Sequence, residues 1–178
     1  MSAFLDAALF HHAEGRPVIA VDENKMPYRK WKHLFTQSQS EEEVREQFVN
    51  GAHGLAIVLY PACNLVVLDQ DGPHAKDAWE EQTGIILPET AHNISRSGYD
   101  HLYFKMPLGD FFHLKRKVRL AKADCDCLDS DGKPKPCGVD LLIRGIVVAP
   151  PTPGYREDPD HPLEDAVSIP QEILNLAL

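Results

Sequence analysis

The sequence predicts an α+β protein with a mostly antiparallel sheet. Helical and strand-like segments follow one another without the regular strand–helix alternation of parallel α/β proteins. Some strand-like segments are separated by short proline-containing turns, which is typical of antiparallel hairpins. The chain has 178 residues, of which 43% are hydrophobic and 25% are charged, so it is long enough for one domain with a sizeable core.

The N-terminal part of the chain is expected to form two helices and one short strand. In order, these elements are a helix over 2–13, a strand over 17–21, a polar loop over 22–39 and a helix from 40 to about 51. The first helix gathers apolar side chains on one face and ends at Gly15. Ser40 and Glu43 form a capping box for the second helix, in which Val44 and Phe48 have the spacing of a single helix face.

The middle of the chain predicts two buried strands followed by a helix. Residues 55–60 and 65–68 are apolar runs separated by a short turn, so we expect them to pair with each other as a hairpin. Pro73 then opens a helix that runs to about Gln82 and ends at Gly84.

The remaining strands are expected in the C-terminal half. They cover residues 101–106, 117–120, 139–143 and 146–149, and a terminal helix follows over 171–178. The first of them alternates strictly, so that Leu102 and Phe104 face away from His101 and Tyr103. The prolines that begin at Pro150 are expected to end the sheet.

The charge of the chain is unevenly distributed. A net charge of −9 disfavours a nucleic-acid partner, but basic residues gather at 25–32 and 115–122 while acidic residues gather at 41–43 and 157–164. Such basic stripes can bind phosphates, although each is also consistent with ordinary solvated surface charge. No apolar run approaches the ~20 residues that span a membrane, and there is no signal peptide pattern, so we expect a cytoplasmic protein without a membrane partner.

Three aspartates are the main candidates for metal binding. Asp69 and Asp71 stand two residues apart at the end of a strand, so their carboxylates point to the same face. Carboxylates that close together repel unless a cation lies between them, and hard oxygen ligands suit Mg²⁺ or Mn²⁺. Asp140 lies within an apolar strand, where an unpaired charge is costly. A polar strand end and a solvent-facing edge residue are the alternative interpretations.

A polar turn precedes the alternating strand. It contains Ser95, Ser97 and Gly98 and leads to His101. Hydroxyl groups, exposed amides and a glycine that allows close approach could together cradle phosphate oxygens. Taken alone, the same residues are more typical of a tight polar turn next to an ordinary surface histidine.

The order of these motifs resembles that of the primase–polymerase (prim-pol) N-terminal domain family of the archaeo-eukaryotic primase superfamily, which occurs in phage and plasmid replication proteins. The likeness covers residues 3–156. The matching segments are Gly15 to Val18, Lys25-Met26-Pro27 with Trp31, Val66 to Gly72, Ser97 to Phe104, Gly138-Val139-Asp140 and Gly145 to Thr152. The chain departs from the family pattern at Tyr99, where a second glycine is usual, and in the longer loop 121–137.

The resemblance implies an RRM-like, mostly antiparallel catalytic sheet with an N-terminal α/β subdomain over residues 1–156. Residues 157–178 would then be a linker and helix that lead into a downstream helicase region. The implied setting is replication in the cytoplasm of a phage-infected or plasmid-bearing cell.

The activity implied by the resemblance is template-dependent primer synthesis and polymerisation by two-metal nucleotidyl transfer. Its partners would be a single-stranded DNA template, a primer and NTP or dNTP. The implied catalytic residues are Asp69, Asp71, Asp140 and His101, with the three aspartates holding two Mg²⁺ or Mn²⁺ ions. The implied nucleotide-binding residues are Lys25, Ser95, Ser97, Gly98 and His101. A non-catalytic nucleic-acid-binding module and a metal-dependent nuclease are the alternatives.

Three of the four cysteines are candidates for a second kind of metal site. Cys125, Cys127 and Cys137 lie close together in sequence, and in a cytosolic protein this spacing favours metal over a disulfide. Thiolate ligands favour Zn²⁺. We expect a structural zinc site with His113 as the first candidate for the fourth ligand and Asp124 or Asp126 behind it. Three reduced thiols in a long loop are the alternative.

Overall fold

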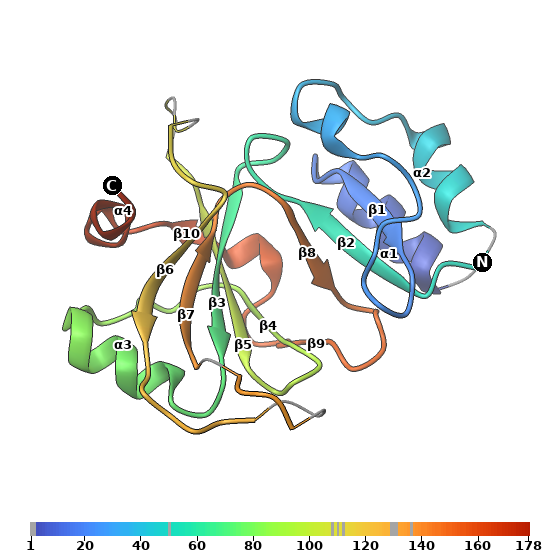
Figure 1. Ribbon diagram of the computed structural model, residues 1–178. Coiled ribbons are helices and arrows are strands. Elements are labelled where there is room, and N and C mark those ends of the chain that lie inside the picture. The colour runs from blue at the N-terminus through green and yellow to red at the C-terminus, as the bar shows by residue number, and fades with distance from the viewer. Residues whose placement is uncertain are drawn as a thin grey trace.

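The computed structural model describes residues 3–49, 51–107, 109, 111, 113–128, 132–135 and 137–178, which form an α+β fold with two sheets (Figure 1). The helices are α1 (Ala3–Ala13), α2 (Glu41–Phe48), α3 (Ala75–Thr83) and α4 (Gln171–Ala177), and 3₁₀ turns cover Lys32–Phe35 and Leu163–Asp165. No helix in these described ranges is long and apolar enough to cross a bilayer.

The smaller sheet carries the N-terminal part of the fold. Its strands, in spatial order, are β1 (Val18–Val21), β2 (Gly54–Val58) and β8 (Ile146–Ala149), and both pairings are antiparallel. All of β1 and β2 is buried, because α1 and α2 contribute to the core on one face and residues 31–35 cover the other. Strands covered on both faces appear in sequence as continuous apolar runs.

The larger sheet has seven strands in the order β6-β7-β3-β5-β4-β9, with β10 beside β5. The strands are β3 (Leu65–Asp71), β4 (His92–Ile94), β5 (Asp100–Lys105), β6 (Lys117–Lys122), β7 (Gly138–Leu142), β9 (Arg156–Glu157) and β10 (Val167–Ser168). Only the β10–β5 pairing among those described is parallel.

The two faces of the larger sheet pack against different partners. Leu65 and Val67 of β3 join the core shared with α1, α2 and the smaller sheet. Val66 and Leu68, which alternate with them, join a second core with α3 and α4. Because side chains alternate along a strand, Asp69 continues the row that faces the smaller sheet.

Local signals in the sequence predicted most elements well. The capping box at the start of α2 is present, since Ser40 Oγ accepts from the Glu43 amide and the Glu43 carboxylate accepts from the Ser40 amide. Gly84 ends α3 in the left-handed conformation that favours glycine. Asn50, near which we expected α2 to end, lies outside the described residues.

The expected hairpin between residues 55–60 and 65–68 is wrong. β2 pairs with β1 and β8 in the smaller sheet, whereas β3 pairs with β5 and β7 in the larger one. The connection between them is a tight turn, with the Tyr60 amide donating to the Leu65 carbonyl at 2.9 Å, but it leads from one sheet to the other. Both runs are buried on both faces, so their apolar character says nothing about which strands they pair with.

The sheet also continues past the prolines that we expected to end it. β9 pairs with β4, and β10 pairs with Phe104 and Lys105 of β5. α4 then buries Ile173 and Leu174 in the second core. The segment after residue 156 therefore supplies strands and apolar contacts to the larger sheet.

Candidate active site

Three neighbouring strands bring the aspartates together. β3 lies between β5 and β7, and Asp69 stands directly opposite His101 on one side and Asp140 on the other. Directly opposed residues in antiparallel strands share a face of the sheet. One ligand oxygen from each of Asp69, Asp71 and Asp140 lies within 4.8 Å of the others. The arrangement therefore concentrates three carboxylates on the face turned toward the smaller sheet.

Asp140 is buried and is neutralised by two basic side chains of β6. Its side chain is 1% exposed. Arg119 donates from Nε to Oδ1 at 2.6 Å and from Nη2 to Oδ2 at 2.9 Å, and Lys117 Nζ lies 2.7 Å from Oδ2. A bidentate guanidinium satisfies both oxygens and offsets the cost of burying the charge. These two residues of the basic stripe at 115–122 therefore face the acidic site.

Asp69 is held beside His101. Its Oδ1 lies 3.2 Å from His101 Nε2. Burial alone raises the pKa of Asp69, but the hydrogen bond from His101 and the positive charges of His101, Lys117 and Lys135 outweigh burial and hold the pKa below the usual carboxyl range. Asp69 is therefore ionised at neutral pH. The other ring nitrogen of His101, Nδ1, is buried without a hydrogen-bond partner among the described residues.

Asp71 faces a lysine from the loop between β6 and β7. Lys135 Nζ lies 3.6 Å from Asp71 Oδ1 and 5.6 Å from the centroid of the Tyr99 ring. Tyr99 stands where the family that the sequence resembles usually has a glycine. Its ring thus packs against the Lys135 ammonium group beside the acidic site. Nothing in the sequence pattern pointed to Lys135, because the loop that carries it has no periodic signal.

The polar turn closes the hairpin of β4 and β5. The Gly98 amide donates to the Ser95 carbonyl and the Ser95 amide donates to the Tyr99 carbonyl, both at 2.8 Å. Ser95 Oγ also accepts from the Tyr99 amide at 3.3 Å, so this hydroxyl helps to shape the turn. Gly98 has φ of 85°, a backbone conformation that side chains disfavour. Ser97 and Gly98 are exposed.

Ring contacts and hydrogen bonds place Lys25 on the same side of the molecule as His101 and the polar turn. Its Nζ lies 5.5 Å from the centroid of the Tyr155 ring, and that ring is 6.0 Å from the ring of His101. Arg96 of the polar turn donates to the carbonyl oxygens of Glu23 and Pro153 at 3.4 and 3.3 Å. The turn around Lys25 and the turn around Ser97 are therefore neighbours, although they are far apart in sequence.

The three clustered cysteines come together, but His113 does not join them. The sulfurs of Cys125, Cys127 and Cys137 lie within 4.8 Å of one another. His113 precedes β6, whereas Cys125 follows it, and a six-residue strand spans roughly 20 Å. The ring of His113 lies near the ring of Phe111, with a centroid distance of 6.4 Å, and not near the sulfurs. Asp124 and Asp126 are likewise not part of the group.

A histidine–aspartate cluster and a large cavity lie elsewhere. Asp158 Oδ2 is 3.1 Å from His92 Nε2 and 2.9 Å from His161 Nδ1, which ties β4 to the segment after β9. The two histidines also line a cavity of about 690 Å³ between the sheet and α3, together with Trp79 and Leu102. None of the three clustered aspartates lines this cavity, so the acidic site is on the other face.

Comparison with known protein families gives one result that covers the site. The family described as "Prim-Pol: Bifunctional DNA primase/polymerase, N-terminal" matches residues 8–172. The matched range includes the three aspartates, the polar turn, Lys25 and the three cysteines. A search of curated proteins found no match to the chain.

Proposed function

Because the chain belongs to the bifunctional DNA primase/polymerase N-terminal family, we propose that it makes primers and extends them along a single-stranded DNA template in phage or plasmid replication. Members of this family are DNA primases and polymerases, so the chain is a nucleotidyltransferase whose substrates are nucleic acid and nucleotides. The observation that carries the residue assignment is the convergence of Asp69, Asp71 and Asp140.

The acidic site fits the divalent cations that such a reaction needs. It offers three carboxylates with ligand oxygens within 4.8 Å of one another, and the lowered pKa of Asp69 keeps that residue charged. Oxygen ligands of this kind select Mg²⁺ or Mn²⁺. His101 Nδ1 is buried without a hydrogen-bond partner among the described residues. Buried polar atoms usually have a partner, so this atom supports a site whose contacts are completed by a bound ligand. Two ions bound there would neutralise charge on the attacking and leaving oxygens during transfer of the α-phosphate.

The protein side chains would then act mainly by positioning. Arg119 fixes the direction of the Asp140 carboxylate through its two hydrogen bonds. His101, Lys25 and the exposed atoms of Ser97 and Gly98 would bind the triphosphate, while Ser95 shapes their turn. Nucleotidyl transfer needs no protein nucleophile, so positioning and charge neutralisation account for the catalytic role of these residues.

One assay separates this proposal from its two alternatives. A labelled single-stranded template, with and without an annealed primer, is incubated with Mn²⁺ and either NTP or dNTP. New or extended strands support the primase–polymerase assignment. Shortened template would indicate a metal-dependent nuclease, and a shift in gel mobility without either change would indicate a non-catalytic binding module.

His101 provides a specific prediction within this proposal. His101→Ala should raise the KM for nucleotide and lower kcat, together costing at least about tenfold in kcat/KM, because it removes a donor to phosphate and the partner of Asp69. His101→Gln retains a side-chain amide donor and should recover part of the loss. Steady-state kinetics with nucleotide and template varied separately make the test. A change in template KM alone would contradict the assignment.

A further inference from the structure

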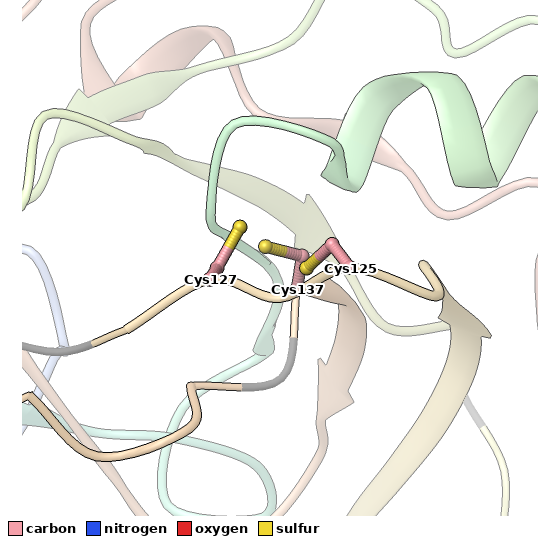
Figure 2. Close-up of side chains that lie close together, drawn as sticks. All are labelled: Cys125, Cys127 and Cys137. Atoms are coloured by element: carbon pink, nitrogen blue, oxygen red, sulfur yellow. The ribbon is translucent and has the colours of Figure 1, made fainter.

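A second group of metal-binding side chains lies in the loop between β6 and β7. The thiols of Cys125, Cys127 and Cys137 are free, and Figure 2 shows their sulfurs gathered beside the connection that leads from β3 into α3. We propose that these three cysteines bind one Zn²⁺ ion as thiolates, and that the ion holds the loop against the turn that follows Asp71.

The separation of the sulfurs fits a zinc ion. Tetrahedral zinc with Zn–S bonds of about 2.3 Å places two sulfurs about 3.8 Å apart. The observed sulfurs all lie within 4.8 Å of one another, so they need to approach by no more than about 1 Å. Thiolates are soft ligands that select Zn²⁺ over Mg²⁺ or Mn²⁺. The cysteine group and the three aspartates therefore select different ions.

The chain supplies three ligands within its described part. No histidine or carboxylate from the described ranges lies close enough to join the three sulfurs. Within those ranges the three thiolates are therefore the ligand set, without the His113 that the sequence suggested as a fourth ligand.

The cysteine group connects the loop to the acidic site through the backbone. Cys137 packs against Gly72, the residue after Asp71, so closely that a methyl group at Gly72 would overlap its sulfur. The Cys137 carbonyl accepts from the Ala123 amide at 3.0 Å and from Arg119 Nη1 at 3.4 Å. An ion on the three sulfurs would therefore hold the end of β6, the loop and the start of β7 together.

The same loop carries Lys135 to Asp71. The Lys135 amide donates to the Cys127 carbonyl at 2.7 Å, and Lys135 Nζ reaches to 3.6 Å from Asp71 Oδ1. Because Cys127 is a ligand in this proposal, zinc fixes the backbone next to Lys135. Loss of the ion should release this lysine from the acidic site.

Elemental analysis tests the zinc site directly. Full-length protein purified without added metal should contain about one zinc ion per chain. The Cys125→Ser/Cys137→Ser variant should contain less than about a tenth of that amount. Cys63→Ser is the matched control, because Cys63 is a buried thiol outside the group, and it should retain its zinc. If the double variant does not fold, Cys127→Ser provides the same comparison at a half-buried position.

Hydrogen exchange tests whether the zinc ion holds the loop in place. The amides of Ala123 and Lys135 should exchange at least about tenfold faster in the zinc-free variant, while those of β1 and β2 keep their wild-type rates. Unchanged exchange would show that the ion does not hold the loop.

Three results would overturn zinc binding itself: wild-type protein without zinc and with freely reacting thiols, a disulfide within the group, or zinc that persists in the cysteine variants. Neither zinc content nor exchange depends on polymerase activity, so failure of the proposed function would leave both measurements valid.

Discussion

Replacing Asp69 by asparagine is expected to lower the rate of nucleotide incorporation at least about 10²-fold. The substitution keeps the shape of the side chain but removes the negative charge, and loss of a catalytic metal ion removes several kcal/mol of transition-state stabilisation. Single-turnover primer extension with Mn²⁺ measures the effect. The thermal unfolding midpoint should change little, because Asp69 lies at the polar end of β3 rather than in either core.

Asp77→Asn is the control for this change. Asp77 is an exposed carboxylate on α3, away from the acidic site, and its replacement removes the same charge. It should incorporate nucleotides at close to the wild-type rate. If Asp69→Asn extended primers within a few-fold of wild type, the assignment of the acidic site would be wrong.

Replacing Arg119 by leucine is expected to destabilise the fold by about 2 kcal/mol in protein free of divalent cations. Breaking a fully buried ion pair costs about 3–5 kcal/mol, and the effect here is smaller because the Arg119 side chain is 32% exposed and Lys117 still contacts Asp140. Urea unfolding measures the difference. Added Mn²⁺ should reduce it, because ions that bind only the native acidic site stabilise the folded state.

A surface ion pair provides the matched control for this prediction. Arg45 and Glu41 on α2 form an exposed i, i+4 pair at 2.7 Å, and such pairs contribute about 0.3–0.5 kcal/mol. Arg45→Leu should therefore change the unfolding free energy only slightly, with no dependence on Mn²⁺. Equal effects of the two arginine substitutions would refute a special role for Arg119.

The features that could be predicted from the sequence are those that depend on neighbouring residues. The capping box of α2, the left-handed glycine after α3 and the alternation along β5 each arise within a few residues of chain. The grouping of Asp69 with Asp71 is similar, since residues two apart in a strand share a face. Short strands such as β4 and β10 were missed because two or three residues are too few to show a period.

Features that depend on strand pairing could not be read from the sequence. Arg119 meets Asp140 because β6 and β7 pair in one particular register, which includes an irregularity between Arg119 and Ala121. His113 was placed with the cysteines because it is near them in sequence, but β6 carries the chain away from it. The prediction that Asp140 needs a partner is confirmed. Identifying Arg119 as that partner requires the register in which β6 pairs with β7.

The parallel pairing of β10 with β5 has a mechanical consequence. β5 carries His101, and β10 joins that strand at only two residue pairs, Val167 with Phe104 and Ser168 with Lys105. A pulling force applied at the C-terminal end of the described chain would first load the apolar contacts of α4 and this short pairing. The two-residue pairing is shorter than the five-residue pairings that hold β3 between β5 and β7. The C-terminal segment would therefore detach under tension before His101 or the three aspartates were displaced.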